Sequence, residues 1–258
     1  MKTLVATNIR GGCGKTTNIL HLAIAASKAK KNNRVLAVDL DPQAHLSYCL
    51  LLGEPPDQRH YIDRLLHGEV LPPLRSQYKN LSVIPSRPEL TGIQDTGILG
   101  KPQWERLLQR AIANYQDDFD YVFIDTPAAY FKIHTLALIA SDAYVISMRP
   151  EAFSLKGFAQ SIDEIETFKK NLELSRPAFA GYFLNGVPKS KRNAIDMIRE
   201  YVTEEYTTAG YEIPESILFD KCRWSTSKTS IFVYPGTKML QACYIKVWAD
   251  LSKYVETL

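Results

Sequence analysis

The sequence predicts an α/β fold, a doubly wound and mostly parallel sheet with helices on both faces. Short β-branched runs alternate with helical patterns along the 258 residues, a glycine-rich turn follows the first run, and aspartates close two later runs. With 45% hydrophobic and 23% charged residues, the chain can bury a full core. Because α/β proteins of this length often form one unit, we expect a single domain over residues 1–258.

Six segments have the length and the apolar composition of buried strands. They cover residues 3–7, 34–40, 81–85, 121–125, 143–148 and 179–184. Apolar residues recur at helical spacing from Trp104 to Tyr115, which predicts an amphipathic helix there. Residues 53–102 are rich in proline and glycine, so we expect mainly surface loops, with a short helix at 61–67.

Charge and cysteine content set broad limits on function. The formal net charge of +3 is mildly basic, which permits nucleic acid as a partner without arguing for it. Cys13, Cys49, Cys222 and Cys243 show no C-x-x-C spacing, which fits a reducing cytosol better than a disulfide framework or a zinc site. No apolar stretch is long enough to span a bilayer, so we expect a cytoplasmic protein.

The residues after the first strand, NIRGGCGKTT (8–17), have the form of a phosphate-binding loop with one departure. The common pattern G-x-x-x-x-G-K-[ST] begins with a glycine, and here Ile9 takes that place while Arg10 precedes the packed glycines. Gly11, Gly12 and Gly14 let the backbone curl so that N–H groups face a phosphate, and the following helix adds its dipole.

Lys15 and Thr16 complete this loop. Lys15 would reach the β- and γ-phosphates of a nucleotide, and the Thr16 hydroxyl would coordinate Mg²⁺. A glycine-rich turn without a ligand is the alternative, and we favour phosphate binding because glycines, lysine and threonine coincide directly after a first strand. The predicted nucleotide site consists of Gly11, Gly12, Cys13, Gly14, Lys15, Thr16 and Thr17.

Aspartates stand at two further strand ends, where a doubly wound sheet binds its ligands. Asp39 and Asp41 in VDLDPQ end the second strand, and we expect them to point to opposite sides so that one faces the phosphates. For this pair alone, a turn before Pro42 without a functional role is the favoured alternative. Asp125 closes the strand in FIDTPAA, in the form of a Walker B aspartate that holds Mg²⁺ through water. The loop and these two strand ends together are stronger evidence for one nucleotide site than any of them alone.

The three junctions resemble the deviant Walker A ATPases, the ParA/MinD group, and within it the short, Soj-like ParA partition ATPases. RGGCGKTT stands where that family has K-G-G-x-G-K-T-T, and DLDPQAHLS matches its D-x-D-P-Q element. FIDTPA matches its D-T-P-P with Ala128 in place of the second proline, and RPEAFSLKG (149–157) is similar to its P-E-x-x-x-x-x-G segment. The resemblance covers nearly the whole chain and implies a P-loop NTPase of the short type, without an N-terminal helix-turn-helix, that binds ATP and Mg²⁺.

The resemblance also implies roles for single residues. Family members dimerise on ATP, and a lysine in front of the glycines crosses to the partner's nucleotide. Arg10 occupies that place. Its guanidinium is longer and planar, so arginine is not equivalent to the family's lysine at this position. Asp41 corresponds to the aspartate that positions the attacking water, Asp39 to its neighbour near the catalytic Lys15, and Asp125 to the magnesium-linked one. Asn185 is similar to an adenine-contacting asparagine, although an asparagine that starts a loop is common for turn reasons alone.

Basic residues in the last third of the chain are DNA-binding candidates. Lys238 stands where the Soj-like proteins bind DNA non-specifically through an arginine. Further candidates, with Trp224 among them, are Lys189, Lys191, Arg192, Lys221, Arg223 and Lys228. Acidic residues are interleaved, so a merely solvated surface is an equal alternative for each of them. The resemblance implies a slow, partner-stimulated ATPase that associates with the nucleoid and moves a plasmid, chromosome or organelle through a ParB-like adaptor.

Two other functions stay open within this fold. A MinD-like membrane-associated positioning ATPase would need a basic amphipathic tail. The C-terminal apolar stripe instead fits core packing, so we expect no membrane contact; it consists of Leu240, Cys243, Tyr244, Val247, Leu251 and Tyr254. A nucleotide-gated DNA-binding module with little hydrolysis keeps the fold and differs in its ATP turnover. A nitrogenase-type reductase is disfavoured, because its cluster cysteines would have to follow the DTP strand closely.

Overall fold

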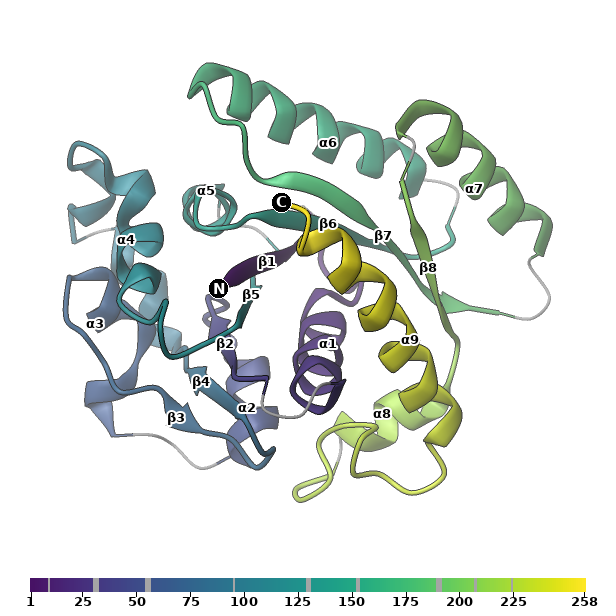
Figure 1. The fold of residues 1–258 in the computed structure, drawn as a ribbon, viewed down its shortest axis with the longest axis horizontal. Helices are drawn as coiled ribbons and strands as arrows, with labels where there is room; N and C mark the ends of the chain where they lie inside the picture. Colours follow the sequence, from purple (N-terminus) through teal and green to yellow (C-terminus); the bar gives the residue numbers. More distant parts are fainter. Residues whose placement is uncertain are drawn as a thin grey trace.

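The computed structural model describes residues 1–8, 10–29, 33–53, 57–94, 96–128, 131–151, 154–188, 192–206, 208–223 and 225–258. This part of the chain forms an eight-stranded sheet in the order β3-β4-β2-β5-β1-β6-β7-β8 (Figure 1). The strands are β1 (Lys2–Thr7), β2 (Val35–Asp39), β3 (Leu74–Arg75), β4 (Leu81–Ile84), β5 (Tyr121–Asp125), β6 (Ala143–Met148), β7 (Ala178–Val187) and β8 (Gly210–Pro214). All pairings are parallel except that of β3 with β4. The predicted fold class is confirmed.

Helices cover both faces of this sheet (Figure 1). They are α1 (Lys15–Ala29), α2 (His45–Leu51), α3 (Ile62–Leu66), α4 (Leu107–Ala113), α5 (Phe131–Ile139), α6 (Ser154–Asn171), α7 (Arg192–Tyr206), α8 (Ile217–Arg223) and α9 (Lys238–Val255). α1, α2, α8 and α9 share a buried core with Leu4 and Phe123 of the strands. α3 to α7 share the opposite core with Val5 and Ile124, because successive strand residues face opposite sides.

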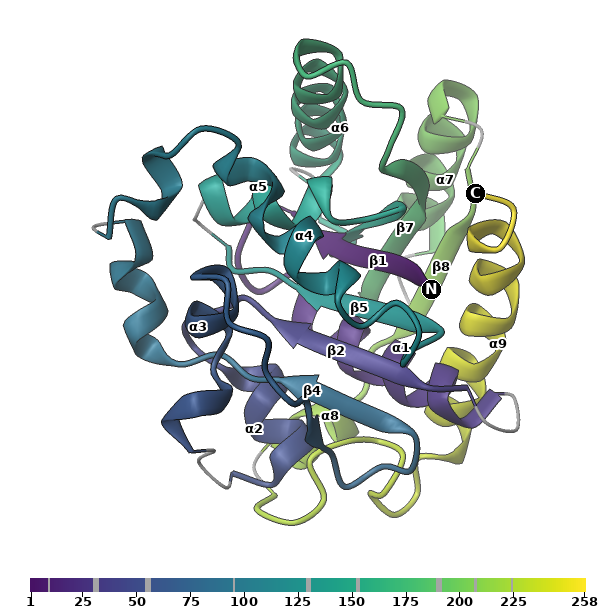
Figure 2. The ribbon, with the colours of Figure 1, turned by 60° about the vertical axis from the view of Figure 1, so that its left-hand side comes forward.

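All six predicted strands are present, and Figure 2 shows four of them, β1, β5, β2 and β4, in this order across the sheet. Two strands at the edges of the sheet were not predicted. β3 has two residues, and β8 spans GYEIP, which begins with glycine and ends with proline. Neither segment contains the apolar run by which a buried strand is recognised, and pairing at a sheet edge tolerates such sequences.

The predicted helix from Trp104 to Tyr115 is present in two parts. A 3-10 turn, η4 (Trp104–Arg106), leads into α4. Tyr115 lies just beyond α4, buried, and its hydroxyl donates to the carbonyl oxygen of Leu71 at 2.7 Å. The short helix predicted at 61–67 is α3. The same irregular region also contains β3, β4 and the 3-10 turns η1 (Gln58–His60), η2 (Pro88–Gln94) and η3 (Ile98–Gly100).

The C-terminal stripe packs into the core as predicted, with one exception. Leu240, Tyr244, Val247 and Leu251 are buried against α1 and the sheet, whereas Tyr254 is 40% exposed. Tyr254 lies in the last turn of α9, next to the chain end, so the prediction was wrong for this residue. No helix in the described ranges has the length and apolar character needed to cross a membrane.

Candidate functional site

The candidate site lies where three neighbouring strands end. β1 leads into the glycine-rich loop and α1, while β5 pairs with both β1 and β2. The register places Ala6 of β1 and Asp39 of β2 each opposite Asp125 of β5. Parallel strands release their following residues at one edge of the sheet. The structure therefore brings together the loop and the aspartates that the sequence assigned to one site.

The loop before α1 has the backbone conformation of a phosphate cradle. Gly12 and Gly14 have φ angles of 71° and 96°, in the left-handed region that favours glycine. A Cβ on Gly14 would lie 2.8 Å from Nδ2 of Asn185, so this close approach excludes a side chain. The first turn of α1 follows directly, and the N–H groups of a helix start have no acceptors within the helix. These groups can therefore bind an anion.

Lys15 is buried, and its ammonium group closes the loop on itself. Nζ donates to the carbonyl oxygens of Asn8 and Arg10, each at 3.1 Å. The Asn8 side chain accepts from the Arg10 N–H at 2.9 Å and donates to the carbonyl of Ser147 in β6 at 2.6 Å. The loop is thus anchored to β6, and the ammonium group of Lys15 is held at the loop by two backbone carbonyls.

Asp39 is a buried carboxylate with several donors. Its Oδ2 accepts from the N–H and the hydroxyl of Ser47 at 2.9 and 2.6 Å, and its Oδ1 accepts from the Asp41 N–H at 3.0 Å. Burial raises the pKa of Asp39 to about 6, and the bonds from Ser47 and Asp41 offset part of that rise. Among the described contacts Asp39 forms no ion pair with Lys15. Its observed partners instead hold the start of α2.

Asp41 lies beyond the end of β2 and is half-buried. Its Oδ1 accepts from the N–H of Gln43 at 2.9 Å. The expectation that Asp39 and Asp41 point to opposite sides is wrong in its premise, because residues two apart in a strand share a face and Asp41 has already left the strand. Both carboxylates raise the pKa of Asp125, so both act on the same site.

Asp125 is fully buried, and neither of its carboxylate oxygens has a hydrogen-bond partner among the described residues. Burial, and then the charge of Asp39, hold the pKa of Asp125 well above its usual value. The Thr16 hydroxyl and Lys15 offset part of this, although the Thr16 approach falls short of hydrogen-bond geometry. An unpaired buried carboxylate is costly, and a nearby cation removes that cost. Carboxylate and hydroxyl oxygens are the donors that Mg²⁺ prefers, so these residues fit that ion.

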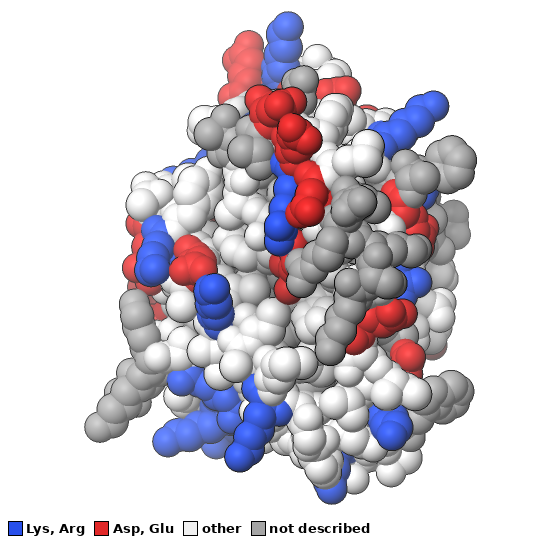
Figure 3. Space-filling view, turned by 90° about the vertical axis from the view of Figure 1, so that its right-hand side faces the viewer, with Lys and Arg blue, Asp and Glu red and all other residues white. Residues whose placement is uncertain are grey.

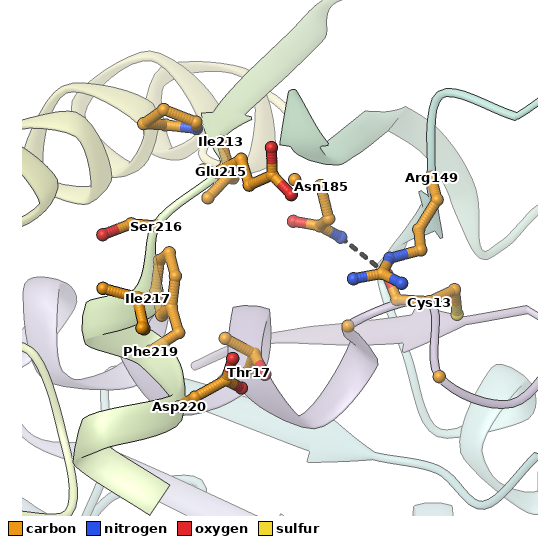
Figure 4. A pocket seen from close by; sticks show the side chains of 14 residues that line it. Cys13, Thr17, Arg149, Asn185, Ile213, Glu215, Ser216, Ile217, Phe219 and Asp220 are labelled. Carbon is orange, nitrogen blue, oxygen red and sulfur yellow. Dashed lines mark hydrogen bonds between the residues drawn. The ribbon is translucent and has the colours of Figure 1, made fainter. Parts of the chain in front are cut away.

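A pocket of about 360 Å³ opens beside the loop (Figure 4). Gly12, Cys13, Gly14 and Thr17 line one side, and residues 213–220 line another. Asn185 also lines it, and its Nδ2 donates to the Cys13 carbonyl at 2.8 Å. The volume is within the range of small-molecule pockets, so a nucleoside can lie here with its phosphates on the loop. Asn185 belongs to β7, so the expectation that it starts a loop is wrong.

Arg10 is exposed at the tip of the loop. Its carbonyl accepts from Lys15 and lies 3.2 Å from the Cys13 thiol. A Cβ on Gly157 in α6 would lie 3.5 Å from Arg10 Nε, so the side chain extends along α6. Its guanidinium forms no ion pair with any residue that the structure describes. It can therefore meet an anion from outside the protomer.

Three DNA-binding candidates have described side chains, and all three are exposed: Lys221 on α8, Lys228 after it and Lys238 at the start of α9. Figure 3 shows basic side chains gathered along the lower part of one face. Lys238 lies at a helix N-terminus, where the dipole favours anions. The remaining candidates lie outside the described residues, wholly or in their side chains: Lys189, Lys191, Arg192, Arg223 and Trp224.

The segment between Lys228 and Lys238 contacts the helix that begins at the phosphate loop. The Ile231 N–H donates to Nε2 of His21 at 3.3 Å, and Nδ1 of the same ring lies 2.7 Å from the Thr17 carbonyl. These partners require the tautomer that carries its proton on Nδ1. The Tyr244 hydroxyl donates to Oδ1 of Asn18 at 2.8 Å. Side chains of α1 thus connect its first turn at Thr17 to the segment between Lys228 and Lys238 and to α9.

Sequence reasoning missed three parts of this site: Ser47, Arg149 and the pocket wall at 213–220. Arg149 directly follows β6, and that position after a strand was a usable signal. Ser47 bonds an aspartate eight residues earlier, a pairing that no local pattern marks. The wall consists of the end of β8, an edge strand without an apolar run, and the start of α8.

Comparisons with known proteins agree with this geometry. The model of the AAA domain family matches residues 1–176. A ParA family protein of Chlamydia trachomatis is 31% identical over 183 residues, covering 69% of this chain and 68% of that protein. The sporulation initiation inhibitor protein Soj of Bacillus subtilis is 31% identical over 173 residues, covering 66% of this chain and 67% of Soj. An uncharacterised Pseudomonas putida protein is 32% identical over 177 residues, and the match spans 65% of its length.

Solved structures match over nearly the whole chain. McdA of Cyanothece in complex with ATP superposes with a TM-score of 0.81 at 22% identity, covering 98% of this chain and 96% of that one. Cobyrinic acid a,c-diamide synthase of Mycobacterium smegmatis, with an ATP analogue and magnesium bound, has a TM-score of 0.79 at 22% identity and covers 99% and 96%. At this identity the superpositions establish the fold, while the family model and the sequence relatives establish descent. The chain belongs to the AAA domain family and, within it, to the ParA family.

Proposed function

We propose that this protein is a Mg²⁺-dependent partition or positioning ATPase that dimerises on ATP, binds DNA non-specifically and moves a cargo through an adaptor of the ParB kind. The observation that carries the nucleotide part is the buried, unpartnered carboxylate of Asp125 beside Thr16, directly behind a loop built to hold phosphate. Burying this carboxylate without a partner costs free energy in the empty site, and a cation that enters together with an anion offsets that cost.

Each residue has a proposed task in this reaction. Gly11 to Gly14 cradle the phosphates with backbone N–H groups, and Lys15 moves its ammonium from loop carbonyls to the β- and γ-phosphates. Thr16 would hold Mg²⁺ through its hydroxyl, and Asp125 would hold the ion through water. The bound ion would neutralise charge on the phosphate oxygens. Asp41 orients the attacking water, and Asn185 lies beside the base.

Two features support a switch that operates between two copies of the chain. Arg10 is exposed and unpaired in the described part, as a cation that crosses to a partner's nucleotide must be. The basic segment contacts α1 through His21, so the nucleotide state at Thr17 has a short path to the DNA surface. ATP binding, dimerisation and DNA binding would then be coupled.

Steady-state ATP turnover with and without duplex DNA tests this function. We expect slow hydrolysis that requires Mg²⁺, with DNA and a cognate adaptor increasing the rate. ATP and DNA binding without measurable turnover under any of these conditions would favour the nucleotide-gated binding module. Burial of the α9 stripe argues against a membrane-associated positioning ATPase, and binding to anionic vesicles but not to DNA would revive that alternative.

A further inference from the structure

Arg149 faces the pocket beside the phosphate loop. It directly follows β6, its side chain is exposed, and it lines the pocket together with Gly12, Cys13 and Asn185. Figure 4 shows its guanidinium next to Cys13 and Asn185, on the opposite side of the pocket from Phe219 and Asp220. The pocket therefore contains a cation on its phosphate-loop side.

The guanidinium of Arg149 has no ion pair or hydrogen bond with any residue that the structure describes. Several other arginines in the described part of the chain form ion pairs, as Arg87 does with Asp63 through two bonds. Glu215 and Asp220 line the same pocket, but neither forms an ion pair with Arg149. A guanidinium offers five N–H donors in a planar fork that fits phosphate oxygens. Its open donors are thus available to a ligand in the pocket.

The guanidinium of Arg149 lies next to the backbone of Gly186. Gly186 has a φ of 70°, and a Cβ there would lie 3.8 Å from Nη2 of Arg149, so the guanidinium lies over bare backbone. The neighbouring Asn185 side chain is bonded to the Cys13 carbonyl. Arg149 is therefore next to the part of the loop whose N–H groups cradle the α- and β-phosphates of a nucleotide.

We propose that Arg149 binds the α- and β-phosphates of the nucleotide within its own protomer, as a second cation beside Lys15. This inference rests on the proposed function. It differs from the task of Arg10, which acts on the partner's nucleotide, and from that of Lys15, which reaches the β- and γ-phosphates. Because the α- and β-phosphates are present before and after hydrolysis, Arg149 stabilises the ATP and ADP complexes equally.

Calorimetric titration of the full chain with Mg·ATP, Mg·ADP and adenosine tests this inference. The variants are Arg149→Ala, Arg149→Lys and, as a matched control, Arg75→Ala, which removes an exposed arginine on β3 at the sheet edge. A charged hydrogen-bonding partner contributes about tenfold to a hundredfold in affinity. We expect Arg149→Ala to weaken ATP and ADP binding by that factor, Arg149→Lys to weaken both less, and Arg75→Ala to change neither. Adenosine affinity stays the same in all variants.

Each other outcome separates the inference from the function beneath it. If the wild-type protein binds ATP and ADP and Arg149→Ala binds them equally well, Arg149 has no part in binding and only this inference fails. An equal loss for adenosine would place the guanidinium on the base and also overturn it. If the wild-type protein binds neither nucleotide, the proposed function fails and takes the inference with it. A thermal melt confirms that the variants are folded.

Discussion

Asp39 and Asp125 occupy opposite positions on the neighbouring strands β2 and β5, and both carboxyl groups are fully buried. Ser47 and the Asp41 backbone donate to Asp39, whereas Asp125 has no hydrogen-bond partner in the described part of the chain. Burial raises the pKa of both groups, that of Asp39 to about 6. Two acids held this close oppose each other's ionisation, so the site is organised for a cation.

This pair predicts how stability changes with pH. Where the folded pKa is raised, the folded protein holds protons that the unfolded chain has released, so stability falls as pH rises from about 4 through about 6. Asp125→Asn removes an ionisable group whose charged form is disfavoured by burial, so it should raise the unfolding midpoint of the nucleotide-free protein at pH 7. Each kcal/mol corresponds to about 2–4 °C for a protein of this size. Thermal melts from pH 5 to 8 measure it.

Asp118→Asn is the control for this measurement, because Asp118 is exposed and precedes β5, at the opposite end of that strand from Asp125. It should leave both the midpoint and its pH dependence unchanged. A less stable Asp125→Asn protein at pH 7 would mean that Asp125 is ionised and has a stabilising partner in solution, contrary to its unpartnered state in the structure.

Lys15 is the loop's own cation, so Lys15→Ala should reduce ATP affinity by about a hundredfold or more while the fold survives. The variant also leaves the carbonyl oxygens of Asn8 and Arg10 without this donor, so a thermal melt checks that it is folded. Equilibrium binding of a fluorescent ATP analogue measures the loss. Lys28→Ala, an exposed lysine in the last turn of the same helix, is the matched control. An unchanged affinity for Lys15→Ala would end the phosphate-loop interpretation.

The loop, six of the strands and the aspartates at the strand ends were all predictable from the sequence, because each is encoded within a few neighbouring residues. Partnerships across the fold were not. Ser47 donates to Asp39 from a separate helix, and Arg149 lines the pocket next to the backbone of Gly186. These contacts depend on how β2, β6 and β7 are placed in space, and β8 with its pocket wall has no apolar run to reveal it.

If Asp41 orients the attacking water, as proposed, Asp41→Ala should lower hydrolysis by about 10²–10⁴-fold while ATP still binds. Its carboxylate accepts only from the Gln43 N–H among described residues, and ground-state contacts to the phosphates come from the loop. The variant should therefore accumulate as an ATP-bound dimer, visible by light scattering. Asp118→Ala should behave as wild type. A variant that binds ATP but stays monomeric would move the role to Asp39 or elsewhere.

Arg10→Ala should weaken ATP-dependent dimerisation by about tenfold or more and leave ATP binding to the monomer nearly unchanged. The side chain is exposed and extends along α6, with no partner in its own protomer among the described residues. Sedimentation over a concentration series separates dimerisation from nucleotide binding at dilute protein. Arg10→Lys restores the charge and should recover most of the dimer. Equal losses in both steps would show that Arg10 acts on its own nucleotide.

Lys238 leads to a prediction about DNA. It is exposed at the first turn of α9, where the helix dipole adds to its charge, and Lys221 and Lys228 are exposed on the segments before it. One protomer offers few phosphate contacts, whereas an ATP dimer presents two copies. Binding should therefore require ATP, be nearly independent of sequence, and fall with salt at a log–log slope of about 0.9 per phosphate contacted.

Lys238→Ala removes one contact from each half of the dimer, so the salt slope should fall by roughly two units and all duplexes should bind more weakly alike. Polarisation titrations on unrelated duplexes at several salt concentrations, with ATP and with ADP, measure both quantities. Lys253→Ala is the matched control: it lies on the same helix, 15 residues and therefore about 22 Å further along, and pairs with Asp250. ATP turnover without DNA should survive both changes. Tight binding by the ADP form would mean that one protomer supplies enough contacts, and a marked sequence preference would mean that the bases are contacted. Either result would contradict a DNA-coating dimer.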